Sequence, residues 1–194
     1  MGNSRLEAFS DGVIAIIITI MVLEMKAPHG DNIITLQPLI PAFISYVLSF
    51  IYIGIYWNNH HHLLHAANLV NGPILWANLH LLFWLSLVPF VTAWMGENNF
   101  AAWPVALYGS VLLMAALAYT ILTRALIQRH GRDSTLAAAV GSDTKGNVSL
   151  LIYAVAVPLS FLNRWLALSA YVFVAVMWFI PDRRIEKRLV VEKP

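Results

Sequence analysis

Long runs of apolar residues, separated by short polar segments, dominate the pattern along this chain. The runs cover residues 6–25, 39–57, 74–95, 102–127, 148–162 and 165–180. A bilayer core of about 30 Å needs about 20 apolar residues per helix, and the last two runs reach that length by extending about a turn into polar residues. The pattern predicts an all-α membrane protein, with six transmembrane helices in one domain over residues 1–194.

Turn and breaker residues separate these runs. Pro28 ends the first run, Asn71-Gly72-Pro73 precedes the third, and Asn163-Arg164 separates the last two. The most hydrophilic connection covers residues 128–147. Pro89, inside the third run, removes a backbone donor, and this predicts a kink there.

The composition supports the membrane assignment. Hydrophobic residues make up 59% of the chain and charged residues 11%, which is typical of a membrane protein. The chain has no cysteine, and this excludes disulfides, thiolate metal sites and cysteine nucleophiles. The first run ends in Glu24-Met25-Lys26 instead of a small-residue cleavage site, so no signal peptide is expected. The expected partner is the lipid bilayer, and nucleic acid is not expected.

The distribution of basic residues predicts the orientation. Six spans place both termini on one side, and that side carries ten of the 12 lysines and arginines: Arg5, Arg124, Arg129, Arg132, Lys145, Arg183, Arg184, Lys187, Arg188 and Lys193. Lys26 and Arg164 lie on the other side. By the positive-inside rule, we expect a multi-pass protein of the cell (inner) membrane with both termini in the cytoplasm.

The first run combines a polar start with an apolar stripe. Arg5, Ser10 and Asp11 lie in its first turns, where ionisable groups are costly and are functional candidates. Beyond them, four residues share one helical face by their spacing: Ile16, Thr19, Ile20 and Leu23. Such a face can line a pore, and the alternative is that it packs against other helices. Ser10 or Asp11 could likewise act as an N-cap.

Histidines gather at the end of the second run and within the third. His61 and His65 are four residues apart, a spacing that can hold a transition metal. No suitable acid accompanies them, so they are weak candidates, and neither a metal site nor a cofactor is predicted. His80, inside the third run near Trp84, needs partners if it is buried. Asp11, Ser10 and Arg5 are the candidate partners.

The first run also carries a motif. Its R-x-x-x-F-S-D pattern, at Arg5, Phe9, Ser10 and Asp11, precedes an Ile/Thr-rich span. With six predicted spans in fewer than 200 residues, the chain resembles prokaryotic members of the transmembrane protein 175 family of cation channels. Weaker similarities are the W-x-x-H-H and N-L-H-x-x-F-W segments.

The resemblance implies a potassium-selective leak channel, with K⁺ as the permeant ion. It implies a homotetramer in which four copies of the first helix line a central pore. Large apolar side chains would form the constriction, at Ile16, Ile20 and Leu23, and Thr19 would contribute to selectivity. An anchoring network would position the helix through Arg5, Phe9, Ser10, Asp11, His80 and Trp84. Physically, a ring of aliphatic side chains can close a pore by dewetting.

Two other function classes are less well supported by the residues. A proton- or cation-coupled secondary transporter would be expected to show broken spans and midplane acids. Of the three carboxylates in the first run, Glu7 and Glu24 lie at its two ends, and Asp11 alone is placed within the span, near its end. An enzyme would need a clustered nucleophile, base or metal set, and the sequence offers no such set beyond the histidines. We therefore expect a channel and no enzyme activity.

Overall fold

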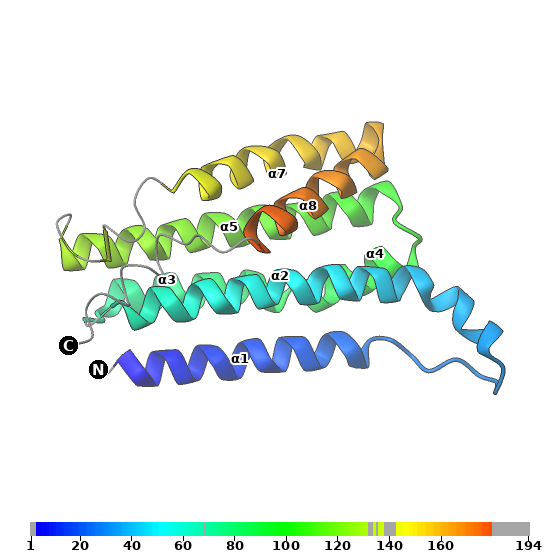
Figure 1. Ribbon diagram of the computed structural model, residues 1–194, viewed down its shortest axis with the longest axis horizontal. Helices are drawn as coiled ribbons and strands as arrows, with labels where there is room; N and C mark the ends of the chain where they lie inside the picture. The colour runs from blue at the N-terminus through cyan, green and yellow to red at the C-terminus, as the bar shows by residue number, and fades with distance from the viewer. Residues whose placement is uncertain (1–2, 68, 132–133, 135, 138–142, 180–194) are drawn as a thin grey trace.

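The structure is a computed structural model, and it describes residues 3–67, 69–131, 134, 136–137 and 143–179. The described residues form helices joined by loops (Figure 1): α1 (Asn3–Leu23), the 3-10 helix η1 (Ile33–Leu39), α2 (Ile40–His65), α3 (Gly72–Ser86), α4 (Val88–Glu97), α5 (Ala102–His130), α7 (Thr144–Leu162) and α8 (Arg164–Phe179). The predicted all-α class is confirmed.

The helix boundaries follow from local chemistry. The Asn71 side chain accepts a hydrogen bond from the backbone of Ile74 and caps α3, while Asp143 caps α7 through the backbone N–H of Gly146. Proline cannot donate a backbone hydrogen bond. Pro89 lies in the first turn of α4, so the third predicted span is divided into α3 and α4 at Leu87.

The helices agree broadly with the predicted runs. Five helical segments of the described chain are long and apolar enough to cross a bilayer: Ser4–Leu23, Ile33–His65, Gly72–Glu97, Ala102–His130 and Thr144–Leu162. α8 is apolar but shorter, and it brings the total to six. α2 continues eight residues past the predicted end of its run, because the histidine-rich segment stays helical. Residue 180 and the basic residues at 132 and 183–193 lie outside the described residues.

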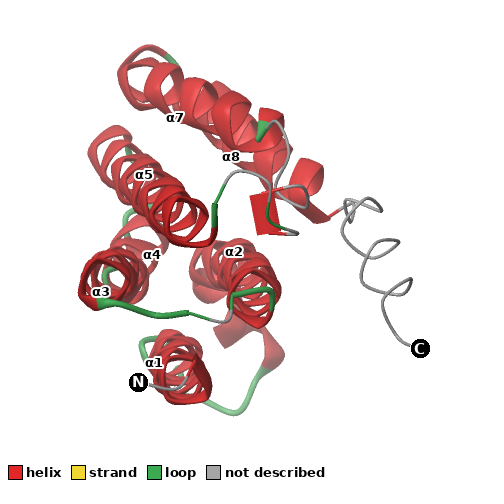
Figure 2. Cartoon of the chain, turned by 90° about the vertical axis from the view of Figure 1, so that its left-hand side faces the viewer, coloured by secondary structure: helices red, strands yellow, loops and turns green. Residues whose placement is uncertain are grey.

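The helices pack as a bundle with α1 at one edge. Seen from the end at which the chain begins, α1 lies against the seam between α2 and the α3–α4 segment, and α7 lies at the far edge (Figure 2). Large side chains such as Tyr108, Tyr171 and Leu112 fill the interior of the main bundle. α1 therefore touches the bundle along one side and leaves its other sides uncovered.

Candidate pore helix and its anchoring site

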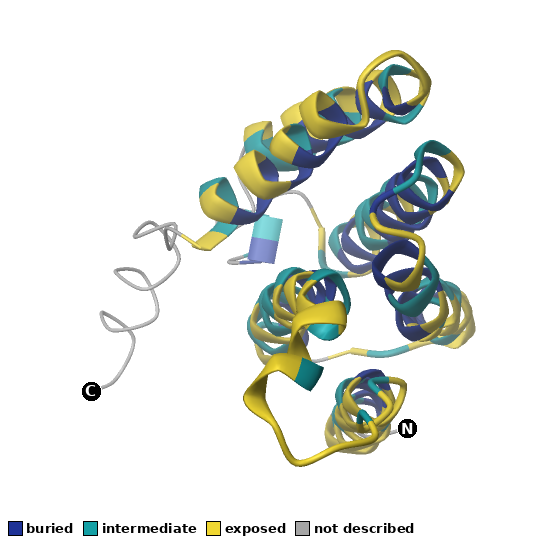
Figure 3. Ribbon diagram, turned by 90° about the vertical axis from the view of Figure 1, so that its right-hand side faces the viewer, coloured by how far each residue is buried: buried dark blue, intermediate teal, exposed yellow. Residues whose placement is uncertain are grey.

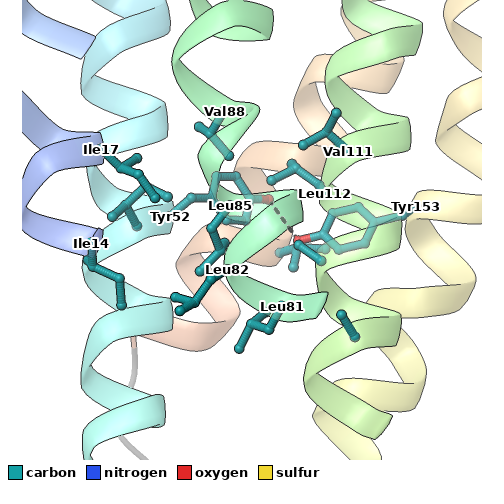
Figure 4. Close-up of a cluster of buried hydrophobic side chains, with 14 of the residues drawn as sticks. Ile14, Ile17, Tyr52, Leu81, Leu82, Leu85, Val88, Val111, Leu112 and Tyr153 are labelled. Carbon is teal, nitrogen blue, oxygen red and sulfur yellow. Dashed lines mark hydrogen bonds between the residues drawn. The ribbon is translucent and has the colours of Figure 1, made fainter. Parts of the chain in front are cut away.

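One face of α1 packs against the bundle. Its five buried residues recur every three or four positions, as expected for one helical face, and are Leu6, Ser10, Ile14, Ile17 and Met21. Ile14 and Ile17 point toward α2 and α3, close to Leu82 and Leu85 (Figure 4). Because lipid tails are as apolar as these side chains, burial alone gives helices little reason to associate in a membrane. Polar contacts therefore carry much of the attachment of α1.

The opposite face of α1 holds the predicted pore residues. Thr19 lies nine residues after the buried Ser10, which is about 900° of rotation and places it on the far side of the helix. Ile16 is 59% exposed, Ile20 41% and Leu23 72%, and Thr19 is exposed as well. The outer surface of α1 is mostly exposed in Figure 3. These side chains are therefore not buried against the helices of their own chain, and a pore-lining role for them stays a prediction.

A buried polar relay ties the first half of α1 to two other helices. The Asn78 side chain on α3 donates a 3.0 Å hydrogen bond from Nδ2 to Ser10 Oγ, which itself donates to the Leu6 carbonyl. The Oδ1 atom of Asn78 lies 2.7 Å from His60 Nε2 on α2. Since the Asn78 amide donates through Nδ2, its Oδ1 accepts, and the His60 Nε2 carries the hydrogen.

The relay is dry and closely fitted. Ser10 and Asn78 have no exposed surface, and His60 is 1% exposed. Among the described residues, the Nδ1 atom of His60 has no hydrogen-bond partner. An orphaned nitrogen is costly in such an environment, so the Asn78 contact is the side-chain bond that satisfies this imidazole. The relay thereby fixes the rotation of α1 about its own axis.

Two further contacts hold α1 to α2. The indole Nε1 of Trp57 donates a 3.0 Å hydrogen bond to an Asp11 carboxylate oxygen. One helical turn closer to the N-terminus of α1, the Glu7 carboxylate lies 2.7 Å from His61 Nδ1. Among the described residues, every polar contact between α1 and a neighbouring helix thus involves residues 3–11 of α1. The outer half of α1 is held by apolar packing of Ile14, Ile17 and Met21.

The other predicted anchoring residues are placed differently. His80 and Trp84 are half-buried on α3 and bond to each other, with Trp84 Nε1 donating to His80 Nε2 at 2.9 Å. Arg5 and Phe9 are exposed, Phe9 to 52%. Ser10 and Asp11 are instead bonded by Asn78 and Trp57. A role for His80, Trp84, Arg5 and Phe9 in anchoring stays a prediction.

Three residues that the structure brings to α1 were not among the predicted site residues. Asn78, His60 and Trp57 lie at the site, and each has a sequence signal. A polar amide in the middle of an apolar run must find a partner, and Asn78 is such a residue. Trp57 precedes His61 by four residues and shares its helical face, while His60 is turned about 100° from His61 and faces Asn78.

The weak metal candidates have other contacts in the structure. His61 contacts the Glu7 carboxylate, and its ring stacks on that of His65 at 6.0 Å between centroids. Within the part of the chain that the structure describes, no group of three histidine, aspartate or glutamate side chains could hold a metal ion. The geometry around His61 is that of a helix–helix contact.

Comparison with known proteins identifies the family. Residues 5–89 match the family described as endosomal/lysosomal potassium channel TMEM175. A potassium channel of Chryseobacterium sp. (strain P1-3) is 54% identical over 189 residues, which are 97% of this chain and 98% of that protein. The chain belongs to the TMEM175 family. The residues matched to the family run from α1 to the start of α4 and include every residue of the relay.

More distant TMEM175 relatives agree in extent and fold. A potassium channel of Streptomyces collinus is 32% identical over 187 residues, covering 91% of each chain. The crystal structure of a lysosomal potassium-selective channel TMEM175 homolog from Chamaesiphon minutus superposes with a TM-score of 0.80. It is 29% identical to this chain, and the match covers 92% of this chain and 96% of that one. TMEM175 is a family of channels, and this confirms that the chain is not an enzyme.

Proposed function

We propose that this TMEM175 family member is a potassium-selective leak channel of the cell membrane, a homotetramer in which α1 lines the pore. One observation carries the proposal. The stripe of Ile16, Thr19, Ile20 and Leu23 faces away from the bundle on α1, which lies at one edge of it. A single copy cannot enclose a pore with this face, so copies must surround it.

The stripe has the chemistry of a gate and a selectivity element. Rings of Ile16, Ile20 and Leu23 would exclude water when narrow and admit hydrated ions after a small outward movement. The Thr19 hydroxyl donates to the Ala15 carbonyl at 2.9 Å. Its proton is thereby used within the helix, and the oxygen lone pairs are left for a cation. Four such oxygens could replace part of the water shell of potassium, which is more cheaply dehydrated than sodium.

The orientation follows from charge. By the positive-inside rule the Arg5 end of α1 faces the cytoplasm. The Ser10, Asp11 and Glu7 contacts then hold the cytoplasmic half of the pore helix, and the apolar constriction lies further out. A broken span is also expected in a secondary transporter, the alternative function, and the break between α3 and α4 is such a feature. The family membership favours the channel.

Ion flux in liposomes tests this proposal. Potassium, sodium and proton gradients are imposed separately on vesicles that contain wild type, Ile16→Asn, Thr19→Ala or Leu23→Ala. Ile16→Asn is expected to raise cation flux because it wets the constriction, and Thr19→Ala to lower the ratio of potassium to sodium flux.

Val155→Asn is the matched control for Ile16→Asn. Val155 is 56% exposed on α7, at the edge of the bundle far from α1, so its change should leave flux as in wild type. Unchanged fluxes in all three stripe variants would remove α1 from the pore. A wild-type protein that passes no potassium would refute the channel itself.

A further inference from the structure

A groove runs along one flank of α1. It lies between α1 and the α3–α4 segment and has a volume of about 450 Å³. Its walls include Ile16 and Ile20 from α1, and Ser86, Pro89, Phe90 and Ala93 from the other side. Phe90 is 62% exposed at the groove. The lining is almost entirely apolar, and two of the proposed constriction residues form part of it.

The position of the groove indicates what covers it. The buried face of α1 points into its own bundle and the Thr19 face points the opposite way, so the groove opens sideways. In a ring of copies around a central pore, the sideways direction leads to the next copy. An unfilled groove beside Ile16 and Ile20 would leave the pore wall open toward the lipid. This step rests on the proposed function.

The other flank of α1 presents a surface that fits. On α2, Phe43, Val47 and Phe50 follow the i, i+4, i+7 spacing of one helical face. They are 55%, 38% and 45% exposed, respectively. We call these three residues the α2 stripe. α1 lies against the seam with α2 at one flank and the α3–α4 segment at the other (Figure 2), so in a ring the α2 stripe of each copy can face the groove of its neighbour.

The two surfaces also match in depth. The Trp57–Asp11 and Asn78–Ser10 bonds fix the register of α2 and α3 against α1. Val47 lies ten residues outward from Trp57, and Phe90 lies twelve residues outward from Asn78. At 1.5 Å per residue both lie about 15–18 Å from the anchoring site. Phe50 and Ser86 correspond in the same way, at seven and eight residues.

Charge complements the apolar fit at the outer end. Glu24 lines the groove, and Lys26 follows two residues later at the end of α1. The one contact between a carboxylate and a basic side chain among the described residues joins Glu7 to His61, so neither Glu24 nor Lys26 has a charged partner within that part of the chain. A neighbouring copy can supply the opposite charge to each of them.

We propose that the α2 stripe of one copy docks into the groove between α1 and α4 of the next, with Glu24 beside Lys26 of the neighbouring copy. Such an interface joins two different surfaces, and repetition around an axis closes it into a ring. The neighbour thereby seals the flank of Ile16 and Ile20, and the constriction is complete only when the ring is complete.

Disulfide cross-linking tests the contact directly, because the chain has no cysteine of its own. Val47→Cys combined with Phe90→Cys should give a covalent ladder up to the tetramer on oxidation. A disulfide within one copy would leave the band at the monomer position, so a ladder reports contacts between copies. Each single variant should run as a monomer on a denaturing gel, as should Val47→Cys combined with Val155→Cys. Phe50→Cys with Ser86→Cys is the second pair if the first does not fold.

The outcomes distinguish a failure of the proposed interface from a failure of the proposed function. If both pairs fail to cross-link while light scattering shows a tetramer and liposomes pass potassium, the interface is wrong and the proposed function stands. If wild type is not an oligomer and passes no potassium, the proposed function fails instead. A ladder in the Val47→Cys with Val155→Cys control would also overturn the interface.

Mixing experiments test the charge contact independently. Glu24→Lys alone and Lys26→Glu alone each place like charges across every interface, and each should lower the melting temperature of the tetramer. When the two variants are co-expressed and alternate in the ring, opposite charges face each other at every interface, and the melting temperature should recover. In a ring built from either variant alone, no contact pairs opposite charges at positions 24 and 26. A mixture that melts between its two components would overturn the Glu24–Lys26 contact.

Discussion

Asn78→Leu is the substitution that most directly probes how α1 is held. Leucine has the same branching at Cγ and the same number of side-chain heavy atoms as asparagine, and it suits the apolar surroundings, but it makes no hydrogen bonds. It removes the 3.0 Å bond to Ser10 and the 2.7 Å contact with His60 together. Since both partners are buried, no bulk water replaces the lost bonds.

The expected cost can be divided between the two partners. Ser10 keeps its bond to the Leu6 carbonyl and loses one accepted bond, worth about 0.6 kcal/mol for an average interhelical bond in a membrane protein. His60 loses the partner of Nε2 while Nδ1 already has none among the described residues. An unsatisfied buried group costs about 1–3 kcal/mol. The sum is about 2–4 kcal/mol, and most of it comes from His60.

Equilibrium unfolding in mixed micelles measures this cost through the intrinsic fluorescence of the seven tryptophans. Asn98→Leu is the matched control, because Asn98 is exposed and bonds to Trp94 within its own segment. Ser10→Ala removes both the bond from Asn78 and the bond to the Leu6 carbonyl, and it should cost about 1 kcal/mol. If Asn78→Leu were no less stable than Asn98→Leu, the relay would not hold α1.

Two further substitutions test the packing behind the pore helix. Gly96→Ala would place a Cβ 2.6 Å from the Ala42 Cα, a backbone atom that cannot move aside alone, and we expect a loss of about 1–3 kcal/mol in the same unfolding assay. A cost below that of an exposed glycine change such as Gly12→Ala would contradict the close approach of α4 and α2. Tyr52→Phe removes the hydroxyl that donates to the Tyr171 carbonyl and accepts from Tyr153 (Figure 4), and should cost about 1–2 kcal/mol. Stability equal to wild type would show that these tyrosines do not join α2 to α7 and α8.

Part of the anchoring site could be predicted from the sequence, and part could not. The position of Ser10 and Asp11 in an apolar helix already indicated that each must find a partner, and both do. The expected partner His80 was chosen because it is a polar residue inside the third span. Asn78 lies two residues earlier, about 200° around the same helix, and it is the one that faces α1. A one-dimensional pattern does not say which face of α3 is turned toward α1.

The sequence by itself determined the helices and their order, and it predicts the orientation of the chain. These depend on local quantities: the length of each apolar run, the breaker residues between the runs and the bias of lysine and arginine. Tertiary structure alone decided which helix opposes which. It joined Ser10 to a residue 68 positions away, turned Ile16 and Leu23 outward, and opened a groove on one flank of α1. In a membrane every helix is apolar on all sides, so hydrophobic pattern does not select neighbours, and a few buried hydrogen bonds and close contacts do.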